Sequence, residues 1–421
     1  MRQDMDAIDW TKRALTLLDS GQPEAALDAA ERALDVDPLA AVVLAVKGDV
    51  LCALRRLDAA LEAYNASIQL EPVNVATWNE RGNCLLDLHC YADALASFER
   101  AIAAEPDEPV PYYGAASALL SLKRPADALA VCERALAVDD SYASAWSTKG
   151  DALVDLGRLE EALAAYQRAI EVDPRRAATW NSLAILLFRL GRHDEALAAY
   201  DRSTALDPTM AQLWNNKGNA LRDLKRYDEA LAAYDRALAL DPGFADAWDN
   251  RGQALRRAGR YQEAIADFDQ TLSHHPNQAA AWFGKAQALR RLRRYDEALA
   301  AYDRAIQFAE HKALWWKIKG ETLADLHRTT EALEAFDAAL ALDSGDADAW
   351  RRRAEALYRL GRPTECLAAC ERALALEPRP DVALAVRLVQ GAANVRLWRH
   401  AEALAAYDAA LSLSPNNLTA R

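Results

Sequence analysis

The sequence has few cysteines and no long apolar run. Its six cysteines, at positions 52, 84, 90, 132, 366 and 370 of 421, match neither a disulfide framework nor a CxxC metal motif. The most apolar stretch, residues 40–54, is interrupted by Lys47 and Asp49 and is too short to span a bilayer. The first ten residues carry acids and no apolar run, so we expect no signal peptide. These absences favour a cytoplasmic protein without a membrane span.

The sequence also lacks an excess of basic residues. Its formal net charge is −13 at pH 7, and its isoelectric point is near 5.2. Nucleic acids and anionic membranes attract proteins that have a dominant basic surface. We therefore expect neither a nucleic acid nor a membrane as the main partner.

Motifs of catalysis and of nucleotide binding are missing too. The sequence contains no G-x-x-x-x-G-K-[ST], no G-x-S-x-G and no H-E-x-x-H, and its histidines have no partner at metal-ligand spacing. Cys366 and Cys370 stand four residues apart, where other parts of the chain place Ala and Tyr, so we interpret them as small buried apolar residues. We expect no enzymatic activity, no cofactor and no metal.

What the sequence does have is a tandem repeat of constant length. Each unit opens with a large residue, usually Trp, and eleven openings follow one another at equal spacing, without insertion: Trp10, Leu44, Trp78, Tyr112, Trp146, Trp180, Trp214, Trp248, Trp282, Trp316 and Trp350. Four residues after each opening stands Gly or Ala, and sixteen residues after it stands Ala, with Cys366 as the exception. Tyr or Phe follows four positions later in most units, and Pro ends most of them.

The pattern within a unit predicts two amphipathic helices. Apolar residues recur at helical spacing on both sides of a short polar turn, such as Lys225-Arg226 in the seventh unit. The small residues allow two helices to approach closely, and the large rings fill the space beside them. Proline after the second helix ends that helix. One such hairpin cannot bury its apolar face alone, so neighbouring units must stack.

This arrangement resembles the tetratricopeptide repeat family, whose pattern is W-x2-L-G-x2-Y, then A-x3-F, then P. The likeness covers residues 7–417 in twelve units, with mild departures such as Lys217 for the first Leu and Leu221 for the first Tyr. The resemblance implies an all-α fold: a right-handed superhelical solenoid of antiparallel helix hairpins. We expect residues 1–421 to form a single domain of this kind.

The twelfth unit departs from the pattern. It fits only if three extra residues are allowed between Pro378 and Gly391, and it ends at Pro415. We expect a longer turn there, with looser stacking of the last hairpin. The last helix keeps the inward apolar pattern, at Leu404, Tyr407 and Leu411. No polar capping helix follows, so we expect a chain cut from a longer one, or docking of this unit on another copy, another protein or its own groove; a frayed end is the alternative.

The family resemblance places the first helix of each unit along a concave groove. In units seven to nine, amides and arginines occupy the groove positions: Asn215, Asn216, Asn219, Arg222, Asn250, Gln253, Arg256, Arg257, Gln287, Arg290 and Arg291. Arg222, Arg256 and Arg290 hold the same position in three consecutive units, so we expect them to form a ladder. Residues 211–312 have a slight basic excess in an otherwise acidic chain. Guanidinium and amide groups grip carboxylates and peptide backbone, although these can also be ordinary solvated helix residues.

These observations lead to a non-enzymatic scaffold that binds a protein or peptide, acidic or carboxylate-bearing, in its groove. The carboxylate clamp of chaperone-binding members is not matched, because Ala280 and Gly284 fall where cations would be expected. The competing interpretation is a structural module that forms a homo-oligomer through its uncapped C-terminal repeat. An enzyme is the third class, and it would need a catalytic domain that the sequence lacks.

Overall fold

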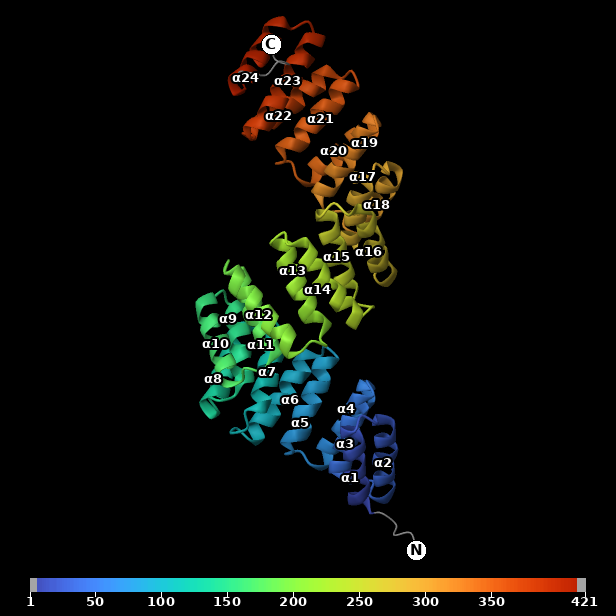
Figure 1. Cartoon of the computed structure of the whole chain (residues 1–421), viewed down its shortest axis with the longest axis vertical. Helices are drawn as coiled ribbons and strands as arrows, with labels where there is room; N and C mark the ends of the chain where they lie inside the picture. Colours follow the sequence, from blue (N-terminus) through green and yellow to red (C-terminus); the bar gives the residue numbers. More distant parts are fainter. Residues whose placement is uncertain (1–5, 415–421) are drawn as a thin grey trace. The chain divides into compact units, whose positions relative to one another are not determined.

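The computed structural model describes residues 6–414, and every regular element in this range is an α-helix (Figure 1). The chain divides into two compact units, Met1–Pro208 and Thr209–Arg421. The first unit contains α1 (Ala7–Asp19), α2 (Pro23–Val36), α3 (Ala41–Ala53), α4 (Leu57–Leu70), α5 (Val75–Asp87), α6 (Tyr91–Ala104), α7 (Val110–Ser121), α8 (Pro125–Val138), α9 (Ala143–Asp155), α10 (Leu159–Val172), α11 (Ala177–Arg189) and α12 (His193–Leu206). The second unit contains α13 (Ala211–Asp223), α14 (Tyr227–Leu240), α15 (Ala245–Arg257), α16 (Tyr261–His274), α17 (Ala279–Arg291), α18 (Tyr295–Phe308), α19 (Ala313–Asp325), α20 (Thr329–Leu342), α21 (Ala347–Arg359), α22 (Pro363–Ala375), α23 (Pro380–Arg396) and α24 (His400–Leu413).

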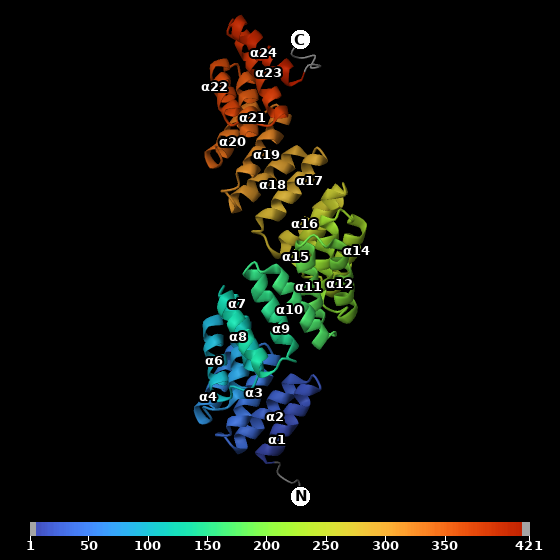
Figure 2. The same ribbon diagram turned by 90° about the vertical axis from the view of Figure 1, so that its left-hand side faces the viewer.

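Consecutive helices pair as hairpins, as α21 and α22 do in both views (Figures 1 and 2). The predicted all-α repeat of twelve helix hairpins is thus confirmed within residues 6–414. That the hairpins form one continuous domain over residues 1–421 stays a prediction. Pro415, the predicted end of the last unit, lies outside the described residues. None of the helices in residues 6–414 is both long enough and apolar enough to cross a bilayer.

A left-handed residue ends the first helix of most hairpins. In the seventh hairpin, Lys225 has φ 61° and its N–H donates to the carbonyl of Arg222 at 3.0 Å. The N–H of Arg226 donates to the carbonyl of Leu221 at 2.9 Å. This pair of bonds satisfies carbonyl groups that the end of a helix leaves free. The chain therefore reverses within a short turn and starts the second helix alongside the first.

The opening tryptophan fixes the loop between two repeats. The indole Nε1 of Trp248 donates to the carbonyl oxygen of Pro242 at 2.9 Å, and Trp78, Trp180 and Trp282 make the same bond to the proline six residues earlier. A tryptophan that packs its ring and satisfies its N–H in this way joins consecutive hairpins. The tryptophans thus anchor the loops between repeats in addition to packing against the helices.

Size complementarity sets the crossing point of the two helices in a hairpin. A Cβ placed on Gly218 would lie 2.6 Å from Cε1 of the Tyr234 ring, and one placed on Gly320 would lie 2.7 Å from Cε1 of Phe336. Only glycine therefore fits opposite these rings. Ala replaces this glycine in five units. The ring position is small as well in the pairs Ala14–Ala30, Ala116–Cys132 and Ala354–Cys370, whereas it keeps a ring in Ala184–Tyr200 and Ala286–Tyr302.

The extra residues of the twelfth repeat lengthen a helix. Helix α23 has 17 residues, whereas α21 has 13. Val382 and Val386, in its first two turns, are buried in the core that α20, α21 and α22 also form. The expectation of a longer, looser turn was wrong, because these apolar residues extend the amphipathic pattern of the helix backwards and bury its start.

Candidate functional site

Three of the predicted groove residues form hydrogen bonds with one another between α13 and α15. Nη1 of Arg222 donates to Oδ1 of Asn250 at 2.9 Å, and Nδ2 of Asn250 donates to Oδ1 of Asn215 at 3.1 Å. Nε of Arg222 also donates to Asp223 at 3.1 Å, and the Arg222 side chain is only 16% exposed. This chain of bonds crosses from one hairpin to the next, so Arg222 and Asn250 hold two repeats together.

Two further amides of the set also have partners within the protein. Oδ1 of Asn219 accepts a bond from the hydroxyl of Tyr234 at 2.8 Å, and Oδ1 of Asn216 accepts one from Nε2 of Gln212 at 2.9 Å. These side chains therefore contribute to the arrangement of α13 and α14.

Five of the six remaining predicted residues, all except Gln253, come together around one cavity of about 810 Å³ among α15 to α19. We call it the arginine pocket. Its lining comprises five arginines, three tyrosines, one amide, one apolar residue and two acids: Arg256, Arg257, Arg290, Arg291, Arg293, Tyr261, Tyr295, Tyr302, Gln287, Ile318, Glu321 and Asp325. Arg256, Arg257, Gln287, Arg290 and Arg291 are the predicted residues among them. Arg222, the first step of the predicted ladder, is not part of the lining.

Carboxylates of the protein itself neutralise some of the positive charge of the pocket. Nη1 of Arg290 lies 3.3 Å from Oε2 of Glu321, and its Nη2 lies 3.0 Å from Oδ2 of Asp325. Nη1 of Arg257 lies 3.6 Å from Oδ1 of Asp223. Arg290 therefore enters the pocket as part of an ion-pair network, and it is not available as a bare charge.

Arg256 differs from Arg257 and Arg290, which form ion pairs. Its Nη2 donates to Oε1 of Gln253 at 3.1 Å, and no carboxylate of residues 6–414 lies within ion-pair distance. Burial lowers the pKa of Arg256, and the charges of Arg257 and Arg291 lower it further. A half-buried guanidinium beside two others is an electrostatically unfavourable arrangement that an anion would relieve.

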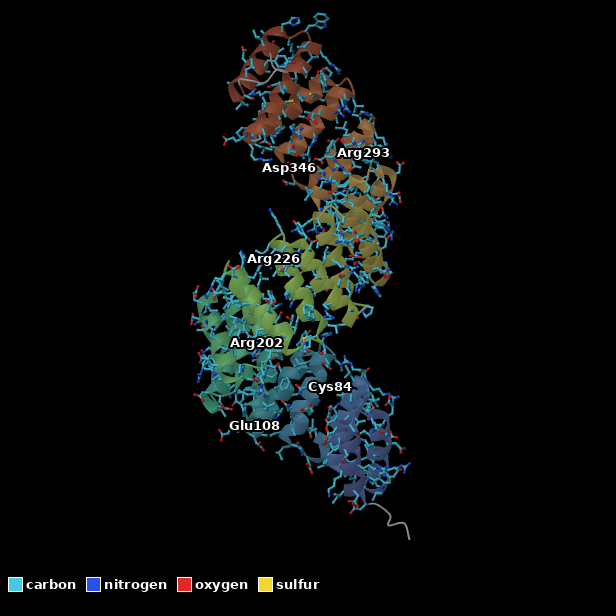
Figure 3. All side chains as sticks on the ribbon, viewed as in Figure 1. Cys84, Glu108, Arg202, Arg226, Arg293 and Asp346 are labelled. Carbon is cyan, nitrogen blue, oxygen red and sulfur yellow. The ribbon has the colours of Figure 1, made fainter. Side chains whose placement is uncertain are left out.

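Two more arginines of the lining have no carboxylate partner within the described residues. They are the exposed Arg291 at the end of α17 and Arg293 in the turn after it, where φ is 60°; Arg293 is labelled in Figure 3. A second cavity of about 270 Å³ shares Arg290, Glu321 and Asp325 with the arginine pocket and continues along α21. The two cavities therefore adjoin each other, and their linings together include residues of α15, α17, α19 and α21.

Several residues of the arginine pocket were not predicted from the sequence. Glu321 and Asp325 stand one full repeat after Gln287 and Arg291, so the repeat period itself could have placed them on the same face. Tyr302 was assigned to the core as the aromatic residue of a second helix. Its hydroxyl could have indicated a polar role. The same position carries Phe in α16 and α20, and a purely apolar core needs no hydroxyl.

Of the three residues predicted for self-association in α24, only Leu404 is largely exposed, and the Tyr407 ring packs against Gly391 of α23. Leu404 is 63% exposed, whereas the corresponding Leu333 and Leu367 are 6% and 8% exposed because the next repeat covers them. Tyr407 and Leu411 are half-buried, while Tyr302 and Leu340 at the corresponding positions are buried. Trp398, in the turn before α24, exposes 82% of its surface.

The cysteines of α22 are packed in the core. Cys366 and Cys370 are both fully buried. Among residues 6–414, no group of three or more His, Cys, Asp or Glu side chains is placed to hold a metal ion.

Comparison with known families gives a direct match. The tetratricopeptide repeat model matches residues 11–75, 147–211, 250–313 and 319–383, and three further models of the same description match residues 85–151, 211–244 and 233–266. Together these matches cover most of the chain, and the first alone covers more than half. A search among curated proteins found no match.

Several solved structures are similar over part or most of the chain. YrrB, described as a TPR protein with an unusual peptide-binding site, is 26% identical over 44% of this chain and 95% of its own, with a TM-score of 0.36. MamA is 26% identical over 39% of this chain and 96% of its own, with a TM-score of 0.37. Yeast Tom70 is 15% identical over 93% of this chain and 96% of its own, with a TM-score of 0.43. On the strength of its regular period, its helix hairpins and the family match, this chain belongs to the tetratricopeptide repeat family.

Proposed function

We propose that the chain is a non-enzymatic scaffold that binds an acidic segment of a partner protein across α15, α17, α19 and α21. Tetratricopeptide repeats form protein-interaction scaffolds, and stacked repeats present extended binding surfaces. The acidic side chain of the segment enters the arginine pocket. The observation that carries the proposal is Arg256, which is half-buried beside Arg257 and Arg291 without a carboxylate of its own within the described residues.

The charges of the pocket also give the segment a direction. The side of the pocket at α15 and at the end of α17 offers unpaired guanidinium groups, whereas the side at α19 presents Glu321 and Asp325, already paired with Arg290. A carboxylate is attracted to the first side and repelled from the second. We therefore place the acid of the segment against Arg256 and Arg291, with the rest of the segment running toward α21.

A titration with labelled peptides tests the proposal. A fluorescein-labelled decamer of alternating Glu and Ala is compared with its Gln-Ala counterpart by fluorescence anisotropy. We expect the Glu peptide to bind more tightly, because charge-assisted hydrogen bonds to guanidinium are about twice as strong as neutral ones. The double variant R256A/R291A weakens that binding at least tenfold, and R236A, on the exposed face of α14, is the matched control. Equal binding of both peptides, or equal effects of the two variants, contradicts the proposal.

A second function is favoured by the face of α24. In other repeats, the same apolar residues pack against the first helix of the following repeat. Leu333 and Leu367 are buried in this way. We propose that α1 of a second copy covers the face of α24, because α1 is a first helix of the same repeat and exposes Ile8 and Leu15. Such a contact joins two different surfaces, so it builds rings or open chains of copies rather than two-fold pairs.

A further inference from the structure

Tyr302 combines complete burial with an unsatisfied hydroxyl. The residue lies in α18 and is 0% exposed, and its hydroxyl has no hydrogen-bond partner among the described residues. Thr322 interacts with it electrostatically and donates its own hydroxyl to the carbonyl of Ile318 at 2.9 Å, but no bond of hydrogen-bond geometry joins the hydroxyls of Tyr302 and Thr322. A buried donor without an acceptor costs free energy, so such groups are rare and usually have a role. Tyr302 lines the arginine pocket and lies within electrostatic reach of Arg256 and Arg290.

Tyr200 and Tyr407 hold the equivalent position but have Ile185 and Ala392 fifteen residues earlier, so no side-chain acceptor stands there. The other three equivalent tyrosines have an acceptor within their own repeat. In each case it is the side chain fifteen residues earlier: Tyr64 donates to Asp49 at 2.8 Å, Tyr166 to Asp151 at 2.6 Å, and Tyr234 to Asn219 at 2.8 Å. For Tyr302 that position holds Gln287, which lines the pocket and makes no such bond. This repeat therefore keeps the donor but lacks the internal acceptor.

The acceptor that fits this pocket is anionic and larger than a carboxylate. Five arginines and a tyrosine hydroxyl offer donors from three helices, against only two acids, and both of these are bound to Arg290. A carboxylate has two oxygens in one plane, and one or two arginine forks satisfy it. A phosphate monoester has three terminal oxygens in a tetrahedral arrangement and a charge of about −1.5 to −2 at pH 7. It can therefore accept bonds from several walls at once and neutralise more than one guanidinium group.

We propose that the arginine pocket is a binding site for a phosphate monoester, held by Arg256 and Arg291, with the Tyr302 hydroxyl donating to one phosphate oxygen. The hydroxyl is closed off from solvent, so a phosphate oxygen reaches it when one of the long side chains that line the pocket rotates. The cavity of about 810 Å³ also has room for the group that carries the phosphate. The inference rests on the proposed function, since a phosphorylated residue of the bound segment would supply this group.

The test uses two conservative variants of equivalent tyrosines. Y302F removes the unsatisfied hydroxyl, and Phe already occupies this position in α16 and α20, so the variant is expected to fold. Y234F is the matched control, because its hydroxyl is bound to Asn219 and Tyr234 does not line the pocket. Inorganic phosphate and acetate are titrated into each protein by calorimetry at equal ionic strength and pH 7.5. We expect phosphate to bind the wild type more tightly than acetate, and Y302F to weaken phosphate binding about tenfold or more. Y234F is expected to leave it unchanged.

The source of the phosphate is distinguished in the same series. A five-residue peptide with a central phosphoserine flanked by alanines that binds more tightly than inorganic phosphate supports a phosphorylated partner segment. If the peptide and inorganic phosphate bind with equal affinity, the phosphate site is supported, and its ligand is a free phosphorylated small molecule. The inference is overturned if phosphate binds no more tightly than acetate, or if Y302F and Y234F behave alike. In that event, binding of the Glu-Ala peptide to the wild type and to R256A/R291A still tests the proposed function separately.

Discussion

The hydroxyl of Tyr64 donates a hydrogen bond to Oδ1 of Asp49 at 2.8 Å and links α4 to α3. Tyr166 and Asp151 repeat this arrangement in α10 and α9 at 2.6 Å. Burial raises the pKa of Asp49 to about 6, and the nearby Glu80 adds to the rise, although the bond from Tyr64 acts in the opposite direction. The folded protein therefore holds a proton on Asp49 more tightly than the unfolded chain does.

This relationship gives a prediction for pH. Because the pKa of Asp49 is raised from 3.8 to about 6 on folding, its contribution to the free energy of unfolding falls as the pH rises from about 4 to 6. D49N removes the charge and keeps an acceptor for Tyr64, as Asn219 does for Tyr234. We expect D49N to raise the free energy of unfolding at pH 7 by about 1–3 kcal/mol and to have little effect at pH 4. Urea unfolding at the two pH values measures this.

A reciprocal control exists in the other unit. N219D introduces a carboxylate beside the Tyr234 hydroxyl, and it should create a loss of stability between pH 4 and pH 7 that the wild-type position lacks. If D49N lowers stability at pH 7, the Asp49 carboxylate is stabilising as an anion and the burial argument is wrong.

The crossing of α19 and α20 gives a second prediction. G320A forces a Cβ to 2.7 Å from the Phe336 ring and should cost about 1–3 kcal/mol. F336C alone should cost about 3–5 kcal/mol through the cavity that it leaves. The double variant copies the Ala354–Cys370 pair of the next repeat, so its cost should be smaller than the sum of the two. Additive costs in chemical unfolding would show that ring and glycine are not matched in size.

A third prediction concerns the face of α24. If a second copy covers it, the mass measured by light scattering should rise with concentration, and L404E should reduce it to that of one chain, because it places a charge in an apolar contact. L240E, on an exposed leucine at the end of α14, is the control. A single-chain mass for the wild type at every concentration rules out association through this face.

The fold could be predicted because its signal recurs in every unit. Trp, Gly, Ala and Tyr at fixed spacing all favour the same helix hairpin, so a period held over eleven units leaves little choice of architecture. The start of α23 could not be predicted in the same way. An insertion breaks the period, and whether it becomes loop or helix depends on the packing of Val382 and Val386 against α21 and α22.

For the candidate site, the sequence could predict only which face of the first helices carries it. The sequence placed the arginines of α13, α15 and α17 on corresponding positions, but it could not show which partners they select. Arg222 binds Asn250 of the next hairpin, and Arg290 binds Glu321, because side chains on stacked helices reach across repeats. The unsatisfied hydroxyl of Tyr302 was also beyond prediction, since it depends on how Gln287 is placed.

The different positions of Arg222 and Arg256 allow the most direct test of the binding site. Both were predicted as steps of one ladder, yet Arg222 bonds to Asn250 and Asp223, whereas Arg256 lines the pocket without a carboxylate within the described residues. The affinity of the Glu-Ala peptide is measured for R222A and R256A, together with the unfolding free energy of each variant. We predict that R256A weakens binding at least tenfold with little loss of stability, while R222A lowers stability by about 1–2 kcal/mol and leaves binding within twofold. Equal loss of affinity in the two variants, or none in R256A, would contradict the assignment of the arginine pocket as the binding site.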